Sequence, residues 1–114
     1  MRRLALAAVL TAPLWPSTAN ARVHRTYATS YCLNGIMADG STVRMRSAAS
    51  DWLPLGTHIR LIGRPFFGGL RRFVIRDTGP ALADGHLDIW HPSCSASVAW
   101  GARPVRFKLG WGKP

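Results

Sequence analysis

Short runs of aromatic, β-branched or alternating residues, set off by glycine and proline, are the feature that most restricts the fold of this chain. The 114 residues include 11 Gly and 8 Pro. Phe73-Val74-Ile75 is aromatic and β-branched, and residues 58–62 alternate in polarity, so both segments predict strands. Many short strands with Gly and Pro turns favour a small β-barrel over a helix bundle.

The same patterns predict about six short strands in a single domain, without repeats or linkers. The expected strands are residues 22–31, 42–45, 58–62, 71–76, 86–90 and 105–109. Residues 47–51 are small and polar, and we expect a loop or one helical turn there. In the last strand, alternation predicts that Val105, Phe107 and Leu109 face inward.

One short helix is expected after the fifth strand. Ser93 is a suitable N-cap for a helix over residues 94–100, and Gly101 is a suitable residue to end it. Trp100, at the end of this helix, is expected to pack in the core. The prediction is therefore a mainly β domain with one short helix.

The first 21 residues have the pattern of a secretory signal peptide. A basic start at Arg2 and Arg3 precedes an apolar run, and Ala19-Asn20-Ala21 is a small-residue cleavage site. The apolar run is too short for a membrane anchor. We therefore expect cleavage after Ala21, a domain over residues 22–114, and a periplasmic or secreted protein without a stable membrane anchor.

The expected mature chain is strongly basic. Removing residues 1–21 takes away two arginines and lowers the formal net charge from +10 to +8. Such an excess favours anionic polymers such as cell-wall glycan, lipopolysaccharide or nucleic acid, and export argues against nucleic acid. The alternative is that the arginines only keep the protein in solution.

Two cysteines, Cys32 and Cys94, occur in the chain. In an exported protein they are expected to form a disulfide, and two free thiols are the alternative. No metal-binding motif uses them, so neither a metal nor a cofactor is expected.

Two aspartates lie where strands meet turns. Asp77 follows a strand and precedes Thr78-Gly79, a position that suits either a functional acid or a turn-former. Alternation in the next strand places His86, Asp88 and Trp90 on one face, away from the core. A carboxylic acid beside an aromatic ring suits sugar cleavage, and a surface acid bonded to loop amides is the alternative.

Four segments in order resemble a family of bacterial cell-wall proteins. They are Leu-Pro-Leu-Gly-Thr at 53–57, Arg-Asp-Thr-Gly-Pro at 76–80, Leu-Asp-Ile at 87–89 and Trp-Gly at 100–101. The set resembles the double-psi β-barrel proteins, in particular the rare lipoprotein A-like proteins and the three-aspartate domain of membrane-bound lytic transglycosylase A. The resemblance covers residues 27–109 and implies a small six-stranded double-psi barrel.

The resemblance also implies roles for the aspartates. Asp77 and Asp88 stand eleven positions apart, as two acids of the three-aspartate branch do. It implies that Asp88 is the catalytic acid and Asp77 a supporting carboxylate. The first family Asp falls on Ala49, and Asp51 is near but out of register.

Other positions also depart from the family pattern. Pro80 replaces a glycine, Ala83 a frequent lysine, and Ser50 the histidine of the lipoprotein branch. These departures leave the roles of Asp51 and Asp39 open.

The expected function is lytic cleavage of peptidoglycan glycan strands by one general acid. That acid must stay protonated near neutral pH, so its pKa must be raised by desolvation or a neighbouring anion. Trp90, His86, Thr78, Gly79 and Trp52 are the expected substrate-binding residues. The alternatives are an expansin-like barrel that binds glycan without cleaving it, and a structural envelope barrel.

Overall fold

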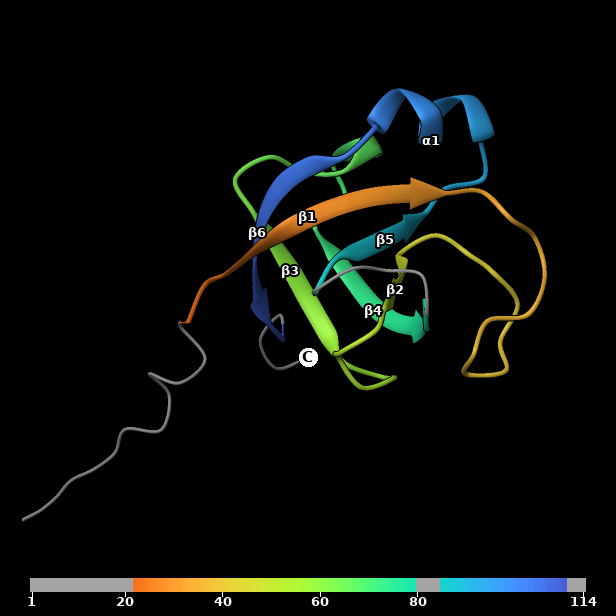
Figure 1. Cartoon of the computed structure of the whole chain (residues 1–114), viewed down its shortest axis with the longest axis horizontal. Coiled ribbons are helices and arrows are strands. Elements are labelled where there is room, and N and C mark those ends of the chain that lie inside the picture. The colour runs from red at the N-terminus through yellow and green to blue at the C-terminus, as the bar shows by residue number, and fades with distance from the viewer. Residues whose placement is uncertain (1–21, 80–84, 111–114) are drawn as a thin grey trace, which may run out of the picture.

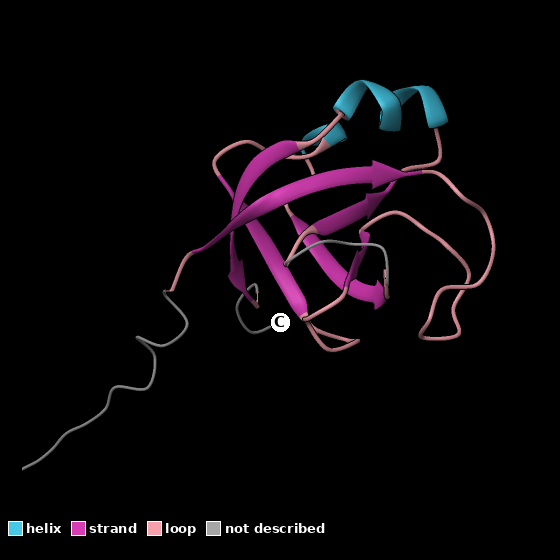
Figure 2. Cartoon of the chain, viewed as in Figure 1, coloured by secondary structure: helices cyan, strands magenta, loops and turns pink. Residues whose placement is uncertain are grey.

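The computed structural model describes residues 22–79 and 85–110, which form a closed barrel of six strands with one short α-helix (Figures 1 and 2). The strands are β1 His24–Tyr31, β2 Ser47–Ser50, β3 His58–Ile62, β4 Arg72–Asp77, β5 Leu87–Trp90 and β6 Arg103–Leu109. The helix α1 is Cys94–Trp100, and a short 3-10 turn spans Phe67–Gly69. The predicted fold class is therefore confirmed.

The strands follow the order β1-β5-β2-β4-β3-β6 around the barrel. β1 runs parallel to β5, β2 runs parallel to β4, and the other neighbours are antiparallel. Thus β5 lies between β1 and β2, and β2 lies between β4 and β5. Each strand of one half of the chain, β1 to β3 or β4 to β6, thus lies between two strands of the other half.

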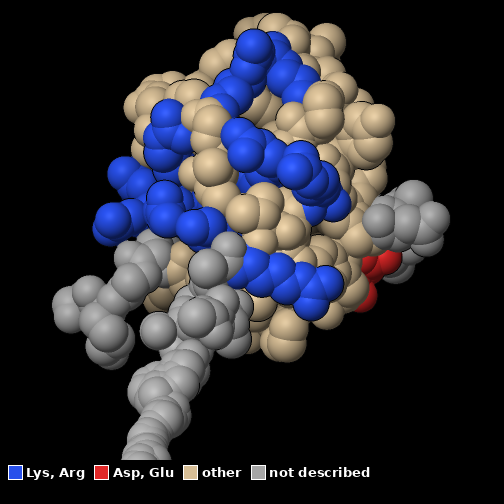
Figure 3. Space-filling model, turned by 90° about the vertical axis from the view of Figure 1, so that its left-hand side faces the viewer, with Lys and Arg blue, Asp and Glu red and all other residues tan. Residues whose placement is uncertain are grey.

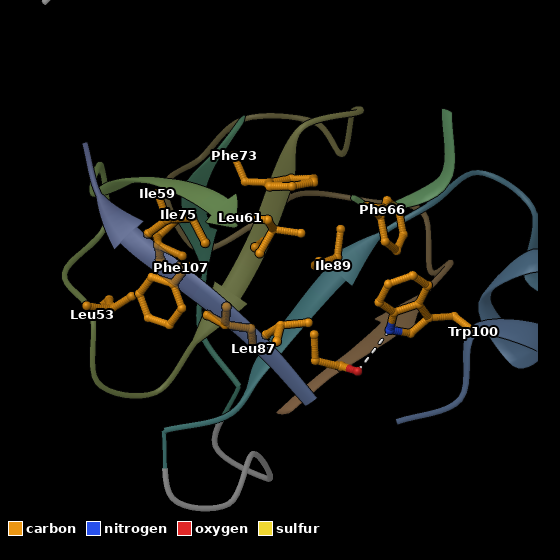
Figure 4. Packing of buried hydrophobic residues seen from close by; sticks show 13 residues of the cluster. Leu53, Ile59, Leu61, Phe66, Phe73, Ile75, Leu87, Ile89, Trp100 and Phe107 are labelled. Carbon is orange, nitrogen blue, oxygen red and sulfur yellow. Dashed lines mark hydrogen bonds between the residues drawn. The ribbon is translucent and has the colours of Figure 1, made fainter. Parts of the chain in front are cut away.

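The core fills the barrel with side chains from every strand (Figure 4). Ile59, Leu61, Phe73, Ile75 and Phe107 are all 0% exposed. They occupy alternate positions of β3, β4 and β6, as expected for strands with one face inside. The remaining positions of these strands face outward and are free to carry other chemistry.

Two sequence predictions about strands are wrong. Residues 47–51 were expected to be a loop or helical turn, but Ser47–Ser50 is the central strand β2, buried between β4 and β5. Residues 42–45 form no strand, and Thr42 makes only an isolated bridge to Ile36. Small residues suit β2 because its neighbours cover it closely, and tertiary packing outweighs their low strand propensity.

The last strand differs from prediction at its end. Val105 and Phe107 are buried as expected, but Leu109 is 41% exposed. Leu109 pairs with Ile59 at the rim of the barrel, next to the end of β6. Its side chain therefore reaches beyond the enclosed core.

The helix and disulfide predictions are confirmed. Ser93 caps α1 by accepting a hydrogen bond from the Ala96 amide, and Gly101 ends the helix with φ 68°. Cys32 and Cys94 form a disulfide, which ties the chain after β1 to the start of α1. Trp100 is 3% exposed and donates from Nε1 to the Ala28 carbonyl.

Other sequence predictions concern residues outside the described ranges. The predicted signal peptide, Pro80, Ala83 and the last four residues all lie there. Within residues 22–79 and 85–110, no helix is long and apolar enough to span a membrane.

Candidate functional site

Asp88 lies in the middle of β5, where three strands meet. It is in register with Thr29 of the parallel strand β1 and with Ala49 of the antiparallel strand β2. The Thr29 hydroxyl donates to Asp88 Oδ1 over 2.9 Å. Leu87 and Ile89, on either side, are fully buried, so Asp88 projects from the outer surface of the barrel while remaining partly covered.

Asp77 ends β4 and is held by three donors. Oδ1 accepts the backbone N–H groups of Ala38 at 3.0 Å and Thr78 at 2.9 Å, and Oδ2 accepts the Tyr31 hydroxyl at 3.2 Å. Because Ala38 belongs to the long connection between β1 and β2, Asp77 fastens that loop to the barrel. Asp77 is thus bonded to loop amides, as the turn-former interpretation predicts, and it also faces the site.

Tyr31 donates to Asp77 and lies close enough to Asp88 to be affected by its charge. It is the last residue of β1, two positions after Thr29, so both side chains lie on the same face of the strand. Burial raises the pKa of Tyr31, and the carboxylates of Asp77 and Asp88 raise it further. Tyr31 is therefore a neutral phenol that donates to Asp77 and lies within the electrostatic reach of Asp88.

The environment of Asp88 favours its protonated form. Burial raises the pKa of Asp88 above its usual value, and the negative charge of Asp77 raises it further. The hydrogen bond from Thr29 and the nearby His86 act in the opposite direction, but the net pKa shift is upward. A carboxyl group of this kind is suited to proton donation.

His86 reaches the acid through Thr29. Its Nε2 lies 3.1 Å from Thr29 Oγ1, the atom that also contacts Asp88. The Thr29 hydroxyl donates to Asp88 Oδ1, and the tautomer of His86 that carries its proton on Nε2 can donate to Thr29 Oγ1. His86 therefore contacts Asp88 through Thr29, and no direct hydrogen bond joins His86 to Asp88 within the described residues.

Trp90 does not lie on an open face, contrary to the prediction. It is 7% exposed, and its Nε1 donates to the Leu33 carbonyl over 2.8 Å. The segment that follows β1, anchored by the disulfide at Cys32, covers the ring. Strand alternation alone did not reveal this cover, because the segment comes from a distant part of the sequence.

The other predicted substrate-binding residues are accessible. Trp52 is 43% exposed and packs against His24 and Phe107 at ring-centroid distances of 6.1 Å. Thr78 is exposed and Gly79 partly exposed, beside Asp77. Trp52 thus offers a ring that sugars can stack on, and Thr78 and Gly79 border the acids.

The remaining described aspartates have different surroundings. Asp39 accepts hydrogen bonds from the Ser41 amide and hydroxyl, which lower its pKa, and it pairs with Arg76 at 3.7 Å. It is a turn residue of the loop between β1 and β2. Asp51 is exposed just after β2 and has no hydrogen bond to the partners of Asp77 or Asp88 among the described residues.

Ala49 occupies the position between the two acids. It is in register with Asp88 on β5 and with Asp77 on β4, where a bulge shifts the pairing. Its neighbour Ala48 faces the core, so Ala49 lies on the same side of the sheet as Asp88. The position that the family resemblance assigns to a third aspartate therefore adjoins both acids but carries a methyl group.

Sequence reasoning missed Thr29 and Tyr31. Their signal was present, since residues 25, 27, 29 and 31 alternate along the predicted first strand and share one face. What was missing was the parallel pairing of β1 with β5, which brings residues 57 to 59 positions apart into hydrogen-bond contact. Within the described residues, no group of three or more His, Cys, Asp or Glu could hold a metal ion.

Comparisons with known proteins leave the function to be argued from the site. No protein-family model matches the chain, and no curated protein matches it at a significant level.

Proposed function

We propose that this protein is exported and cleaves the glycan strands of peptidoglycan, with Asp88 as the general acid. The observation that carries the proposal is the position of Asp88, partly covered on β5 and in register with Ala49, which pairs with Asp77; burial, and to a smaller extent the charge of Asp77, raises the pKa of Asp88. A carboxyl group that keeps its proton at higher pH can donate it to a glycosidic oxygen. Positive charge then develops at the anomeric carbon of the sugar.

The second step uses the same carboxylate. After donating its proton, Asp88 accepts a proton from a hydroxyl of the same sugar, whose oxygen attacks the anomeric carbon and closes an anhydro ring. No water enters this reaction, which makes it a transglycosylase rather than a hydrolase. The hydrogen bond from Thr29 orients Asp88 throughout and stabilises its anionic form.

Asp77 has a supporting role in this proposal. Its three donors, Tyr31 and the amides of Ala38 and Thr78, hold its carboxylate in place. From there its charge raises the pKa of Asp88 and favours the positive charge that develops on the sugar. Two carboxyl groups in different environments thereby take different roles.

The charge and the disulfide support the cellular setting of the proposal. A disulfide persists in oxidising compartments such as the periplasm or the cell exterior. The excess of Lys and Arg suits an anionic wall polymer. With the predicted signal peptide, these features support export to the envelope.

Mass spectrometry of purified murein sacculi, incubated with the protein, tests the proposal. Products with anhydro ends are expected. Products with reducing ends would replace the transglycosylase by a hydrolase. The absence of soluble products, with the protein bound to the sacculi, would favour the second candidate function.

That second candidate is a barrel that binds glycan without cleaving it. The observation that favours it is Ala49, which leaves two acids where the family resemblance implies three. In this case Trp52 and the Lys and Arg side chains of the chain would hold the wall polymer. The two candidates differ in one outcome, because only the enzyme loses a measurable activity when Asp88 is changed.

A further inference from the structure

The outward face of four neighbouring strands carries a row of cations. Arg60 of β3 lies opposite both Arg72 of β4 and Lys108 of β6, and Arg106 of β6 lies opposite Arg25 of β1. Side chains in register share a face, as do residues two apart on a strand, so all five lie on one face. Figure 3, seen from the side on which β6 lies in Figure 1, shows Lys and Arg crowded together there.

This arrangement does not serve the stability of the barrel. Like charges directly opposite each other on neighbouring strands are destabilising. Among the described residues, the only ion pair joins Arg76 to Asp39, and neither belongs to the row. A bound anion would offset the repulsion within the row.

A hollow of about 300 Å³ opens at one end of this face. It lies between β1, β6 and the turn that follows β3. Its lining consists of Arg25, Thr26, Ile62, Arg64, Pro104, Val105 and Arg106. Within residues 22–79 and 85–110, none of the three arginine side chains has a hydrogen-bond or ion-pair partner.

Gly63 allows Arg106 to lie against the turn. A Cβ atom at Gly63 would come within 2.8 Å of Arg106 Nη2, so any other residue would push the guanidinium aside. Gly63 also has φ +83°, which glycine adopts without strain. The Gly63 carbonyl accepts a hydrogen bond from Arg71, which helps to fix the turn. Gly63 thus leaves the space beside the turn that the Arg106 guanidinium occupies.

We propose that this hollow binds the phosphate group of a phosphorylated sugar. The guanidinium fork matches phosphate oxygens, and three unpaired guanidiniums suit a doubly charged phosphomonoester better than a single carboxylate. The volume is about ten times the ~30 Å³ that a water occupies in the liquid, so there is room for more than a phosphate. The uncharged part of the lining, which includes Ile62 and Pro104, suits the sugar.

The location separates this site from the acids. The hollow is lined by Arg25 and Thr26 at the start of β1, whereas Asp88 of β5 is in register with Thr29, further along the same strand. A ligand in the hollow therefore leaves Asp88 accessible, and the inference does not depend on the proposed cleavage reaction. The recess also favours a discrete phosphate group over a bilayer surface, because the three arginines border one hollow.

Isothermal titration calorimetry with glucosamine 6-phosphate tests the inference, with glucosamine as the matched probe that lacks phosphate. The phosphorylated sugar is expected to bind and glucosamine is not. Arg106→Gln is expected to weaken binding at least about tenfold, because it removes a charge-assisted hydrogen bond. Arg44→Gln removes the same charge from an exposed loop residue outside the hollow, and we expect a change below about twofold because distant charges are screened.

Gly63→Ala provides a second variant that leaves the net charge unchanged. It is expected to weaken binding by displacing Arg106, and circular dichroism verifies that each variant is folded. Equal affinity for both probes, or equal weakening by Arg106→Gln and Arg44→Gln, would overturn the inference. Binding to phosphatidylglycerol vesicles without binding to glucosamine 6-phosphate would also overturn it, in favour of a membrane-binding surface.

Discussion

The two halves of the barrel, β1 to β3 and β4 to β6, share a pairing pattern but differ in chemistry on one side. Thr29 of β1 pairs with Asp88 of β5, and in the same way Asp77 of β4 pairs with Ala49 of β2. Ala49 and Asp88 also pair with each other. Exchanging the halves therefore exchanges Thr29 with Asp77 and Ala49 with Asp88. Both acids come from the second half.

On the opposite side of the barrel four arginines are kept under the same exchange, and Lys108 exchanges with Ile62. Arg25 pairs with Arg106 as Arg72 pairs with Arg60. The repeated framework thus carries the same pair of arginines twice, whereas both carboxylates lie in one half only.

The difference shows how a symmetric framework can give two acids different environments. A symmetric site would surround both carboxyl groups with the same partners. Here Asp88 has Thr29 and a raised pKa, and Asp77 has Tyr31 and two loop amides. Separate roles for two acids require such separate environments.

The largest expected effect comes from replacing Asp88, whose equivalent position in the first half is Ala49. Asp88→Asn keeps the shape of the side chain but cannot transfer the proton, so the cleavage rate is expected to fall about 10²- to 10⁴-fold. Binding to murein should persist. Release of soluble muropeptides and a pull-down with sacculi measure the two quantities.

Asp51→Asn is the matched control for this variant, since Asp51 is an exposed acid on the same chain. Its activity is expected to equal that of the unaltered protein. Full activity in Asp88→Asn would show that the acid is misassigned, and Asp77, Asp51 and Asp39 would be tested next.

The disulfide is the covalent link between the two halves. Cys32 follows β1 and Cys94 begins α1, 62 positions later. For a loop of this length, the chain-entropy model gives a loss of about 4 kcal/mol in the free energy of unfolding when both are changed to Ser. Urea unfolding of the double variant measures this loss. An unchanged midpoint and an unchanged dependence on urea would show that the disulfide does not stabilise the barrel.

The sequence predicted the strands and the helix that depend on local residue patterns. Turn residues, alternation and helix caps were sufficient to predict β3, β4, β5 and α1, with boundaries close to those observed. The strand β2 was missed because Ser-Ala-Ala-Ser has no strand-forming residues, and only its neighbours make it a strand.

The sequence predicted the two acids of the site, but it did not predict the residues that contact them. Asp77 and Asp88 follow from strand ends and alternation, whereas Thr29 and Tyr31 reach them only through the pairing of β1 with β5. The burial of Trp90 likewise depends on a remote segment, at Leu33. Pairings between distant segments leave no local pattern in a single sequence.

Asp77 is expected to matter for stability as well as activity. Asp77→Asn keeps one acceptor oxygen for the amides of Ala38 and Thr78, but it replaces the oxygen that accepts from Tyr31 with an NH₂ group and removes the charge that strengthens all three hydrogen bonds. We expect a loss of about 1–3 kcal/mol in the free energy of unfolding. Tyr31→Phe removes only the phenol donor and serves as the comparison, with an expected loss of about 1 kcal/mol.

Chemical denaturation of both variants measures these losses. A smaller loss for Asp77→Asn than for Tyr31→Phe would show that the charge of Asp77 adds little to the hydrogen bonds from the amides of Ala38 and Thr78. Equal stability of Asp77→Asn and the unaltered protein would remove the structural role of Asp77.

The smallest effect concerns Ala49, the residue that exchange of the halves makes equivalent to Asp88. Ala49→Asp places a third carboxylate beside Asp88, and a like charge raises the pKa of its neighbour. A general acid works only while protonated, so the rate declines as the pH rises through its pKa. The alkaline limb of the pH–rate profile is therefore expected to move upward, by about one unit if the added repulsion is about 1.4 kcal/mol. Ala49→Asn adds a side chain of nearly the same shape without the charge, so the alkaline limb should stay in place. A shift as large in Ala49→Asn as in Ala49→Asp would show that crowding at this buried position, rather than charge, changes the pKa of Asp88.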